Sequence, residues 1–222
     1  MSAPAHHRPR GYRNPHGRDR HGGSGLASFL WEWARSRPTG EPPMVQRADL
    51  SFLRGNRSVP TATWLGHATY LVQLDGLNIL TDPHLSPRAS PFGFAGPERL
   101  IPPAIDLANL PPIDVVLLSH DHYDHLDAPT LRALAEAHDP TVIAPLGHAA
   151  LLAALGCRSV TELDWWAQHR RRGFSVTAVP VQHFSGRGLR DRNRRLWAGF
   201  VFEADGRKLF FAGDTGYSPD FA

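Results

Sequence analysis

The residues best suited to chemistry lie in one short segment, residues 119–127, which reads SHDHYDHLD. It places His120, His122, Asp124 and His125 within six positions. In an extended chain His120 and His122 project to the same side, and a bend after the tyrosine brings the other two nearby. Three imidazoles would repel one another if protonated and would be costly to bury unpaired. A divalent cation removes both problems, and nitrogen and oxygen ligands suit zinc, with iron or manganese as alternatives.

The other interpretation of this segment is a polar surface turn that happens to be rich in histidine. An apolar run, DVVLLS at residues 114–119, leads straight into the segment and is typical of a buried strand. Functional residues of α/β sheets gather beyond the carboxyl ends of strands. We therefore interpret the segment as metal-binding.

Two later residues are further potential ligands, each directly after a predicted strand. His183 follows a strand predicted over 174–180, and Asp214 follows one over 207–212. Taken singly, either is an ordinary loop residue. Combined with the histidine-rich segment, they predict a metal site assembled from several strand ends.

The elements that must position these residues are strands and helices in mixed order. Asp-Gly pairs at 75–76 and 205–206 predict tight hairpins. Residues 82–112 are rich in Pro, Gly and Ala and predict a long ordered loop, of a length that is often functional. Hairpins beside strand–helix alternation indicate a layered α/β fold with mixed sheets. Strands are predicted at 61–65, 70–74, 77–81, 114–119, 141–144, 174–180, 196–203 and 207–212, and helices at 128–138 and 146–155.

Length and composition are those of one globular domain with an extension. The chain has 222 residues, of which 41% are hydrophobic and 20% are charged, so it is too apolar to be wholly disordered. We expect a disordered basic arm at residues 1–25, an N-terminal extension with a short helix at 26–58, and the main domain at 59–222. The helix is expected at 26–37.

Charge and cysteine content narrow the cellular setting. The net charge is +3 and the arginines are scattered, which weakly favours anionic partners over specific nucleic-acid binding. The single cysteine, Cys157, excludes an internal disulfide framework and indicates a reducing compartment. No stretch approaches the roughly 18 apolar residues of a membrane span. We expect a cytoplasmic protein, with peripheral contact to a membrane surface as an open alternative.

A series of sequence blocks resembles, in order, the N-acyl-phosphatidylethanolamine-hydrolysing phospholipase D group of the metallo-β-lactamase superfamily. The similarity spans residues 60–222. The blocks are TWLGHATYLVQLDGLNILTDP at 63–83, RASPFGFAGPERL at 88–100, LPPIDVVLLSHDHYDHLD at 110–127, ELDWW at 162–166, QH at 182–183 and LFFAGDTGYSP at 209–219.

The resemblance implies an αββα sandwich, in which two mixed β-sheets lie between helical layers. It also implies two zinc ions. One would bind His120, His122 and His183, the other would bind Asp124 and His125, and Asp214 would bridge them. A further histidine normally joins the second metal from a later strand. This chain ends at residue 222, so we expect the fold to be incomplete at the C-terminus. With that last histidine missing, the alternative to two zinc ions is a single zinc ion.

The activity implied is hydrolysis of a phosphodiester in N-acyl phospholipids by water activated between the two metals. Asp124 is the candidate catalytic residue that orients the water and relays its proton. Two alternatives remain open. The chain could hydrolyse another substrate, such as a lactone or a nucleic acid, or it could be an inactive metal-binding fragment.

Residues outside the ligand set are weaker candidates. Asp82 is expected to hydrogen-bond a ligand imidazole or to be a turn residue, and His67 to face the substrate or to cap a strand. Arg190 and Arg192 are expected either to bind anionic lipid at a loop edge or to be merely exposed. Four further histidines are expected on solvated surfaces, namely His84, His138, His148 and His169. The oligomeric state is left open.

Overall fold

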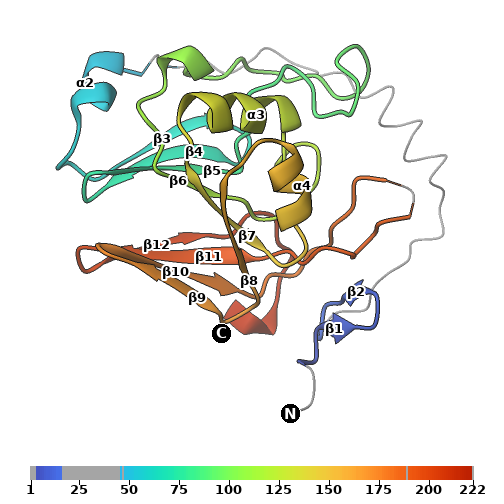
Figure 1. Ribbon diagram of the computed structural model, residues 1–222. Coiled ribbons are helices and arrows are strands. Elements are labelled where there is room, and N and C mark those ends of the chain that lie inside the picture. Colours follow the sequence, from blue (N-terminus) through green and yellow to red (C-terminus); the bar gives the residue numbers. More distant parts are fainter. Residues whose placement is uncertain (1–3, 17–45, 47, 189, 222) are drawn as a thin grey trace.

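The computed structural model describes residues 4–16, 46, 48–188 and 190–221. In these residues two β-sheets pack face to face, and α-helices cover the outer face of the larger sheet (Figure 1). None of these helices is long and apolar enough to cross a membrane.

The larger sheet has six strands in the order β3-β4-β5-β6-β7-β8. Its first three strands, β3 (Thr61–Gly66), β4 (Thr69–Leu74) and β5 (Leu77–Thr81), are antiparallel. The turn between β4 and β5 uses Asp75 and Gly76, with φ angles of 49° and 75°. Positive φ at both central residues is what a type I′ hairpin turn requires, so the Asp-Gly pair forms the predicted hairpin.

The last three strands of this sheet run parallel because a helix separates each from the next. They are β6 (Val115–Leu117), β7 (Thr141–Pro145) and β8 (Ser159–Leu163). Helix α3 (Ala128–Ala137) follows β6, and helix α4 (Ala149–Ala154) follows β7. Every residue of β6 and β7 is buried, as expected for strands that are covered on both faces.

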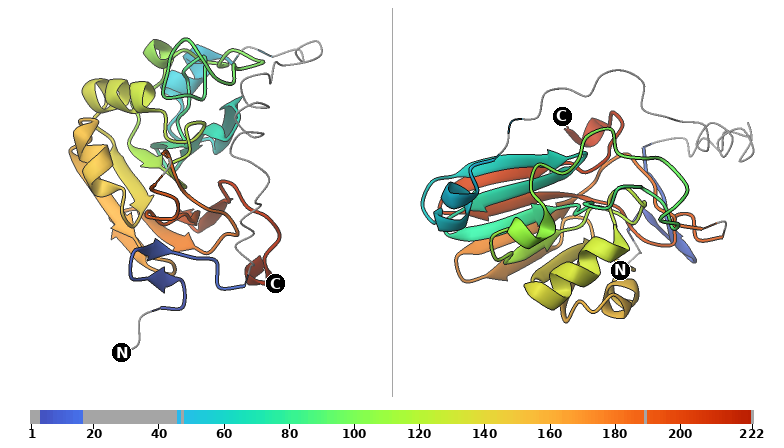
Figure 2. Two further views of the ribbon diagram at one scale, coloured as in Figure 1. Left: turned by 90° about the vertical axis from the view of Figure 1, so that its right-hand side faces the viewer. Right: turned by 90° about the horizontal axis from the view of Figure 1, so that it is seen from above.

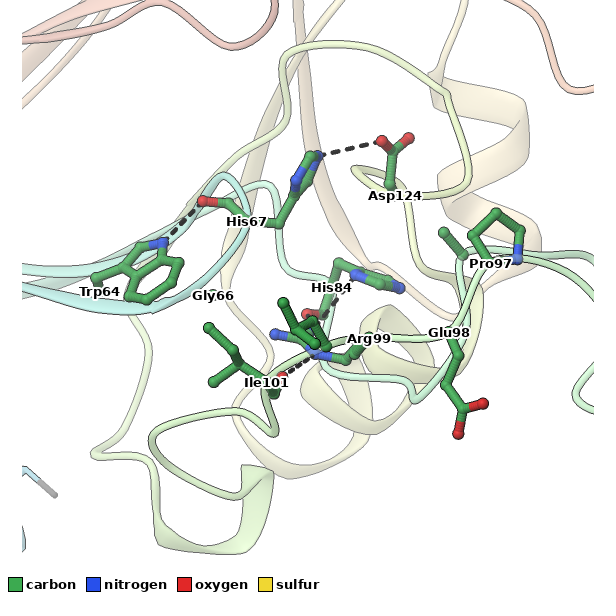
Figure 3. Close-up of a pocket in the computed structure, with 11 residues that line it drawn as sticks. Trp64, Gly66, His67, His84, Pro97, Glu98, Arg99, Ile101 and Asp124 are labelled. Carbon is green, nitrogen blue, oxygen red and sulfur yellow. Dashed lines mark hydrogen bonds and ion pairs between the residues drawn. The ribbon is translucent and has the colours of Figure 1, made fainter. Parts of the chain in front are cut away.

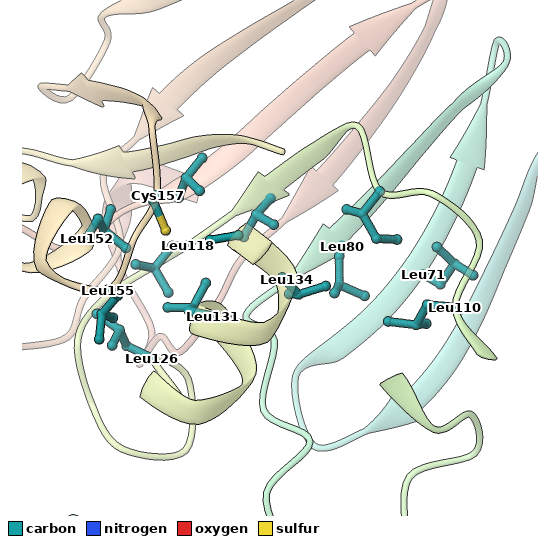
Figure 4. Packing of buried hydrophobic residues seen from close by; sticks show 14 of the residues in the cluster. Leu71, Leu80, Leu110, Leu118, Leu126, Leu131, Leu134, Leu152, Leu155 and Cys157 are labelled. Carbon is teal, nitrogen blue, oxygen red and sulfur yellow. The ribbon is translucent and has the colours of Figure 1, made fainter. Parts of the chain in front are cut away.

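An apolar core lies between these helices and the outer face of the larger sheet (Figure 4). Leu80 and Leu118 on the sheet side pack with Leu131 and Leu134 of α3 and with Leu152 of α4. All five side chains are essentially inaccessible to solvent. A shorter helix, α2 (Leu50–Gly55), adds Leu53 to the same core.

The smaller sheet has four strands in the order β12-β11-β10-β9. The sequence predicted a mixed sheet here, but all the strand pairs of this sheet are antiparallel. Parallel neighbours need a long crossover connection, usually a helix, and the described residues between the strands of this sheet form no helix. The sequence pattern does not predict β8 or β9, because both are short and rich in polar residues. The strands are β9 (Gln168–Arg171), β10 (Phe174–Val179), β11 (Gly199–Ala204) and β12 (Arg207–Phe211).

A second apolar core holds the two sheets together. It joins Ile79 and Leu117 of the larger sheet to Phe200 and Phe202 of the smaller one. Trp197, which precedes β11, is buried in the same core. The outer face of the smaller sheet carries no α-helix in the part of the chain that the structure describes. The layers seen are therefore helix, sheet and sheet, viewed edge-on in Figure 2.

Residues 4–16 fold onto the domain, although the sequence predicted a disordered arm over residues 1–25. Strands β1 (His7–Arg8) and β2 (Gly11–Tyr12) pair with each other. The backbone N–H of Tyr12 donates to the carbonyl of Asn193 at 2.8 Å. The composition argument failed because the histidines and tyrosine of this arm make specific contacts that a count of aliphatic residues does not detect. The helix expected at 26–37 lies outside the described residues.

Candidate metal centre

Loops at one edge of the two sheets bring all six candidate ligands together. The segment after β6 supplies four of them, and the loops after β10 and β12 supply one each. A hydrogen bond from the N–H of Ala198 to the carbonyl of Ser119, 3.0 Å long, joins the sheets at this edge. The six residues are His120, His122, Asp124, His125, His183 and Asp214.

Three imidazole nitrogens form a first group. His120 Nε2 lies 2.8 Å from His122 Nδ1, and His183 Nε2 lies 3.2 Å from each of these atoms. Three nitrogens that bind one zinc ion tetrahedrally at about 2.0–2.1 Å are about 3.3 Å apart. The donor set therefore fits one zinc ion with little movement.

A second group gathers around His125. Its Nε2 atom lies 3.4 Å from Asp214 Oδ1 and 3.8 Å from Asp124 Oδ2. His67 joins this group, because its Nε2 lies 3.1 Å from Asp124 Oδ2 and 3.2 Å from His125 Nε2. The His125 imidazole and the two carboxylates match zinc in donor type, and His67 can hydrogen-bond Asp124 beside them. The sequence indicated only that His67 faces a substrate or caps a strand, since nothing local relates it to residues 120–125.

Asp214 lies between the two groups. Its Oδ1 faces His125, and its Oδ2 is 3.7 Å from His183 Nε2. The residue before it, Gly213, has a φ of 59°, and a Cβ there would lie 2.5 Å from the Cβ of Ser119. A glycine is thus required for the strand end to approach Ser119 closely and to direct Asp214 towards both groups.

A buried carboxylate, Asp82, contacts candidate ligands of both groups, directly or through Ser119. It is fully buried and accepts hydrogen bonds from the N–H and the hydroxyl of Ser119. It also pairs with His125 Nδ1 at 2.6 Å, and the Ser119 hydroxyl lies 2.8 Å from His120 Nδ1. A carboxylate behind an imidazole fixes its tautomer and its orientation.

The electrostatics favour neutral imidazoles in the first group and a positive charge in the second. Burial, together with the neighbouring histidines, holds the pKa of His120 well below its usual value and lowers that of His183 to about 4. Burial opposes protonation of His125, but the nearby carboxylates, Asp82 foremost, outweigh it and raise its pKa to about 10. Burial also raises the pKa of Asp124, but His67 and His125 outweigh it and lower that pKa.

A framework of polar side chains supports the histidine-rich segment, and the sequence did not reveal it. Asp121 is fully buried, accepts from the N–H of Gly186 at 2.7 Å and pairs with Arg195 at 2.7 Å. Arg187 donates to the carbonyls of Asp121 and Leu126. The only local signal is that Asp121 alternates with the histidines and so faces the opposite side.

The two arginines expected to bind anionic lipid lie on an exposed loop. Arg190 and Arg192 are both solvent-exposed. The guanidinium carbon of Arg192 lies 4.2 Å from the ring centre of Phe184, and that ring lies 4.6 Å from the ring of His122. Arg192 is therefore next to the first group, whereas no such contact relates Arg190 to it.

A cavity of about 310 Å³ opens beside the second group (Figure 3). His67 and Asp124 form its inner wall, and Trp64, Arg99 and Ile101 line the rest. Arg99 donates to the carbonyls of His84, Leu65 and Ile101. It approaches so closely that a Cβ at Gly66 would clash with it. Two side chains of the second group therefore face this cavity.

Two of the four histidines expected on the surface are buried instead. His84 is 3% exposed and His148 is fully buried. His148 Nδ1 bonds to the carbonyl of Pro145 at 2.8 Å, and Arg99 donates to the carbonyl of His84. His84 lies in the loop after β5 and His148 caps the start of α4, and tertiary packing covers both side chains.

The chain matches known proteins over most of its length. Residues 77–221 match the model of the beta-lactamase superfamily domain. An uncharacterised protein of Mycobacterium tuberculosis is 41% identical over 202 residues, covering 88% of this chain and 53% of that protein. The N-acyl-phosphatidylethanolamine-hydrolysing phospholipase D 1 of Caenorhabditis elegans is 42% identical over 167 residues, covering 70% of this chain and 47% of that enzyme. The chain thus spans about half the length of these relatives.

A solved structure agrees with the fold. The structure of a metallo hydrolase from the archaeon Ignicoccus hospitalis has a TM-score of 0.56 and 19% identity, and it covers 72% of this chain and 63% of that chain. At this identity the match concerns the fold alone.

Proposed function

Because this chain belongs to the metallo-β-lactamase superfamily, we propose that it is a zinc-dependent phosphodiesterase that cleaves N-acyl-phosphatidylethanolamine-type phospholipids. The nematode relative with that activity in its name supports the substrate class. The zinc assignment is supported by the nitrogen and oxygen donors of the two groups.

One observation carries the proposal: the two oxygens of Asp214 face different ligand groups. A carboxylate in this position can hold two metal ions side by side, as two-metal hydrolases require. In the proposal three histidines would hold one ion, Asp124 and His125 would hold the other, and Asp214 could contribute to both. The three histidines are His120, His122 and His183.

Two zinc ions, when bound, lower the pKa of water and offset the negative charge that develops on the phosphate. The protein's own part is to position groups and to move one proton. Asp82 and Ser119 hold His125 and His120 in orientation. His67 donates to Asp124 Oδ2 at 3.1 Å and so fixes the carboxylate at the wall of the cavity.

Asp124 is the proposed proton carrier. Its side chain is 40% exposed, so the attacking water can reach it from the cavity. The water oxygen bonds to phosphorus while the bond from phosphorus to the ethanolamine oxygen breaks. Asp124 accepts the proton of the water and passes it to the leaving oxygen. The products are a phosphatidic acid and an N-acylethanolamine.

The test uses zinc-loaded protein and a substrate panel. We expect turnover of N-acyl-phosphatidylethanolamine in mixed micelles, and slower turnover of a lactone and of an oligonucleotide. Asp214→Asn and His122→Ala should abolish turnover, whereas His169→Ala, which changes a histidine on strand β9, should retain it. Zinc content is measured for each variant, so that loss of metal and loss of chemistry are distinguished.

Other outcomes support the alternatives. Preferred turnover of the lactone or the nucleic acid would keep the hydrolase and replace the substrate. Fewer than two zinc ions at the candidate metal centre, without turnover of any substrate, would indicate a metal-binding fragment. Full turnover by Asp214→Asn with verified zinc content would contradict the site itself.

The anion-binding role of the exposed arginines is also part of this proposal. Arg192 lies near the first group through Phe184, and a guanidinium pairs well with phosphate. Arg190→Ala/Arg192→Ala should raise the KM for anionic lipid without lowering kcat. An unchanged KM would remove these residues from the proposal.

A further inference from the structure

A second set of metal-binding side chains lies where the N-terminal arm meets the loop between β8 and β9. His6 Nε2 is 2.6 Å from Asp164 Oδ1, and His7 Nε2 is 2.8 Å from Asp164 Oδ2. These residues share no member with the candidate metal centre. We propose that His6, His7 and Asp164 bind a divalent cation, with zinc the best fit, and so fasten the arm to the domain.

The donor types and spacing suit a cation. Two imidazole nitrogens and one carboxylate are a common ligand set for zinc and leave a fourth position open. The side chains of His7 and Asp164 are 29% and 27% exposed, so a cation can enter from solvent. Without a cation each Nε2 donates its proton to the carboxylate. A cation replaces both protons, and each histidine nitrogen needs to move about 0.5 to 0.7 Å further from its carboxylate oxygen to reach zinc-bound spacing.

The three side chains are held in place by other contacts. The His6 ring stacks on Trp165 with 4.3 Å between ring centres, and its side chain is 8% exposed. Asp164 Oδ1 accepts the backbone N–H of Trp165 at 2.9 Å. The carbonyl of His6 accepts the N–H of Arg13 at 2.9 Å. Ligands that are already ordered lose little entropy when they bind a metal.

Two carboxylates, those of Asp164 and Glu162, supply negative charge at this place. Burial raises the pKa of Tyr12 on the same arm, and the charges of Asp164 and Glu162 raise it further. The Tyr12 ring also lies 5.2 Å from the ring of His7. A negative potential that disfavours a phenolate at this place stabilises a bound cation.

Fastening the arm has a consequence for the candidate metal centre. Asn14, on the same arm, donates from its side-chain nitrogen to the carbonyl of His183 at 2.7 Å. Gly11 packs so closely on the carbonyl of Asn193 that a Cβ there would lie 2.1 Å from it. A cation at the arm therefore steadies the loop that carries His183.

Metal content of tag-free protein tests the proposal. His7→Ala removes a ligand, and Asp164→Asn keeps the size of the side chain while removing its charge. The control, His16→Ala, changes a histidine of the same arm that lies 3.6 Å from Asp220 and outside the set. We expect both ligand variants to bind one zinc equivalent fewer than the wild type and the control. Equal zinc content in all four proteins would overturn the proposal.

Protease sensitivity is a second measurement. Trypsin can cut the arm after Arg10 and Arg13 when the arm detaches. At free zinc of ten times Kd, binding favours the attached arm by a factor of about 11, so cleavage should slow about tenfold. His7→Ala should show no slowing, and slowing equal to that of the wild type would contradict the inference. Neither measurement depends on turnover, so both are independent of the proposed phosphodiesterase activity.

Discussion

At the residue scale, a single buried carboxylate holds candidate ligands of both groups. Asp82 pairs with His125 Nδ1 and bonds to Ser119, whose hydroxyl contacts His120. Because the carboxylate is fully buried, these partners are what compensates its lost hydration. Asp82 also has a φ of 29°, so its backbone is held in an unusual conformation at the end of β5.

Replacing Asp82 tests this arrangement. Asp82→Asn keeps the size but loses the charge that orients His125, so we expect zinc affinity to fall about 10- to 100-fold. Competition with a chromogenic chelator measures the change. Asp127→Asn is the matched control, because Asp127 is a buried carboxylate that accepts from Ser86 and Thr130. A similar loss of zinc affinity in both variants would contradict an orienting role for Asp82.

His138 connects stability to pH away from the metal centre. Its Nδ1 accepts the backbone N–H of Ile113 at 2.9 Å, and burial lowers its pKa. The unfolded chain then binds more protons than the folded chain below about pH 6.5, so the free energy of unfolding falls as the pH drops.

The variant His138→Asn keeps an acceptor for Ile113 but cannot titrate. We expect urea unfolding to show a smaller loss of stability between pH 7.5 and pH 5.5 in this variant than in the wild type. An identical pH dependence in the two proteins would show that His138 does not contribute.

At the element scale, tight strand ends determine where the ligands lie. The end of β12 approaches Ser119 at Gly213, and the β11–β12 turn at Gly206 has open space around it. Both glycines have positive φ, 59° and 69°. A residue with a side chain would therefore be strained at both positions, but only at position 213 would its Cβ also clash with a neighbour.

Alanine at each position separates these effects. Gly206→Ala should lower stability by about 1 kcal/mol through strain alone and should leave zinc binding intact. Gly213→Ala adds a clash with Ser119, so we expect displacement of Asp214 and loss of one zinc equivalent. Metal analysis together with thermal unfolding measures both effects. Wild-type zinc content in Gly213→Ala would show that the close approach is not needed.

At the scale of the whole molecule, the candidate ligands come from both sheets. His120 follows β6 of the larger sheet, whereas His183 and Asp214 follow strands of the smaller one. A bound metal therefore links the two layers across the core that contains Leu117 and Phe200. Binding to the folded state alone raises stability by mass action.

Removing the metal should consequently lower global stability. At free zinc about 1,000 times Kd, we expect zinc to contribute about 4 kcal/mol to the free energy of unfolding. Thermal unfolding with zinc and with a chelator measures this contribution. His122→Ala should respond far less to the chelator, and an equal response would place the stabilising ion elsewhere.

Local patterns were enough to predict much of the fold and to single out the candidate ligands. The Asp-Gly turns form the predicted hairpins, and the apolar run before His120 is a buried strand. These features depend on residues close together in the sequence, so spacing and backbone preference reveal them. The ligand types after β10 and β12 were found in the same way, because each directly follows a strand.

Contacts between distant segments needed the folded chain. His6 and Asp164 are 158 positions apart, Asp121 and Arg195 are 74 apart, and His67 and His125 are 58 apart. No local preference relates such pairs, since packing of whole elements brings them together. The sequence alone therefore showed which residue types could bind a metal. Only the packing of the two sheets decided which of those side chains lie close together, because that packing depends on contacts between distant segments.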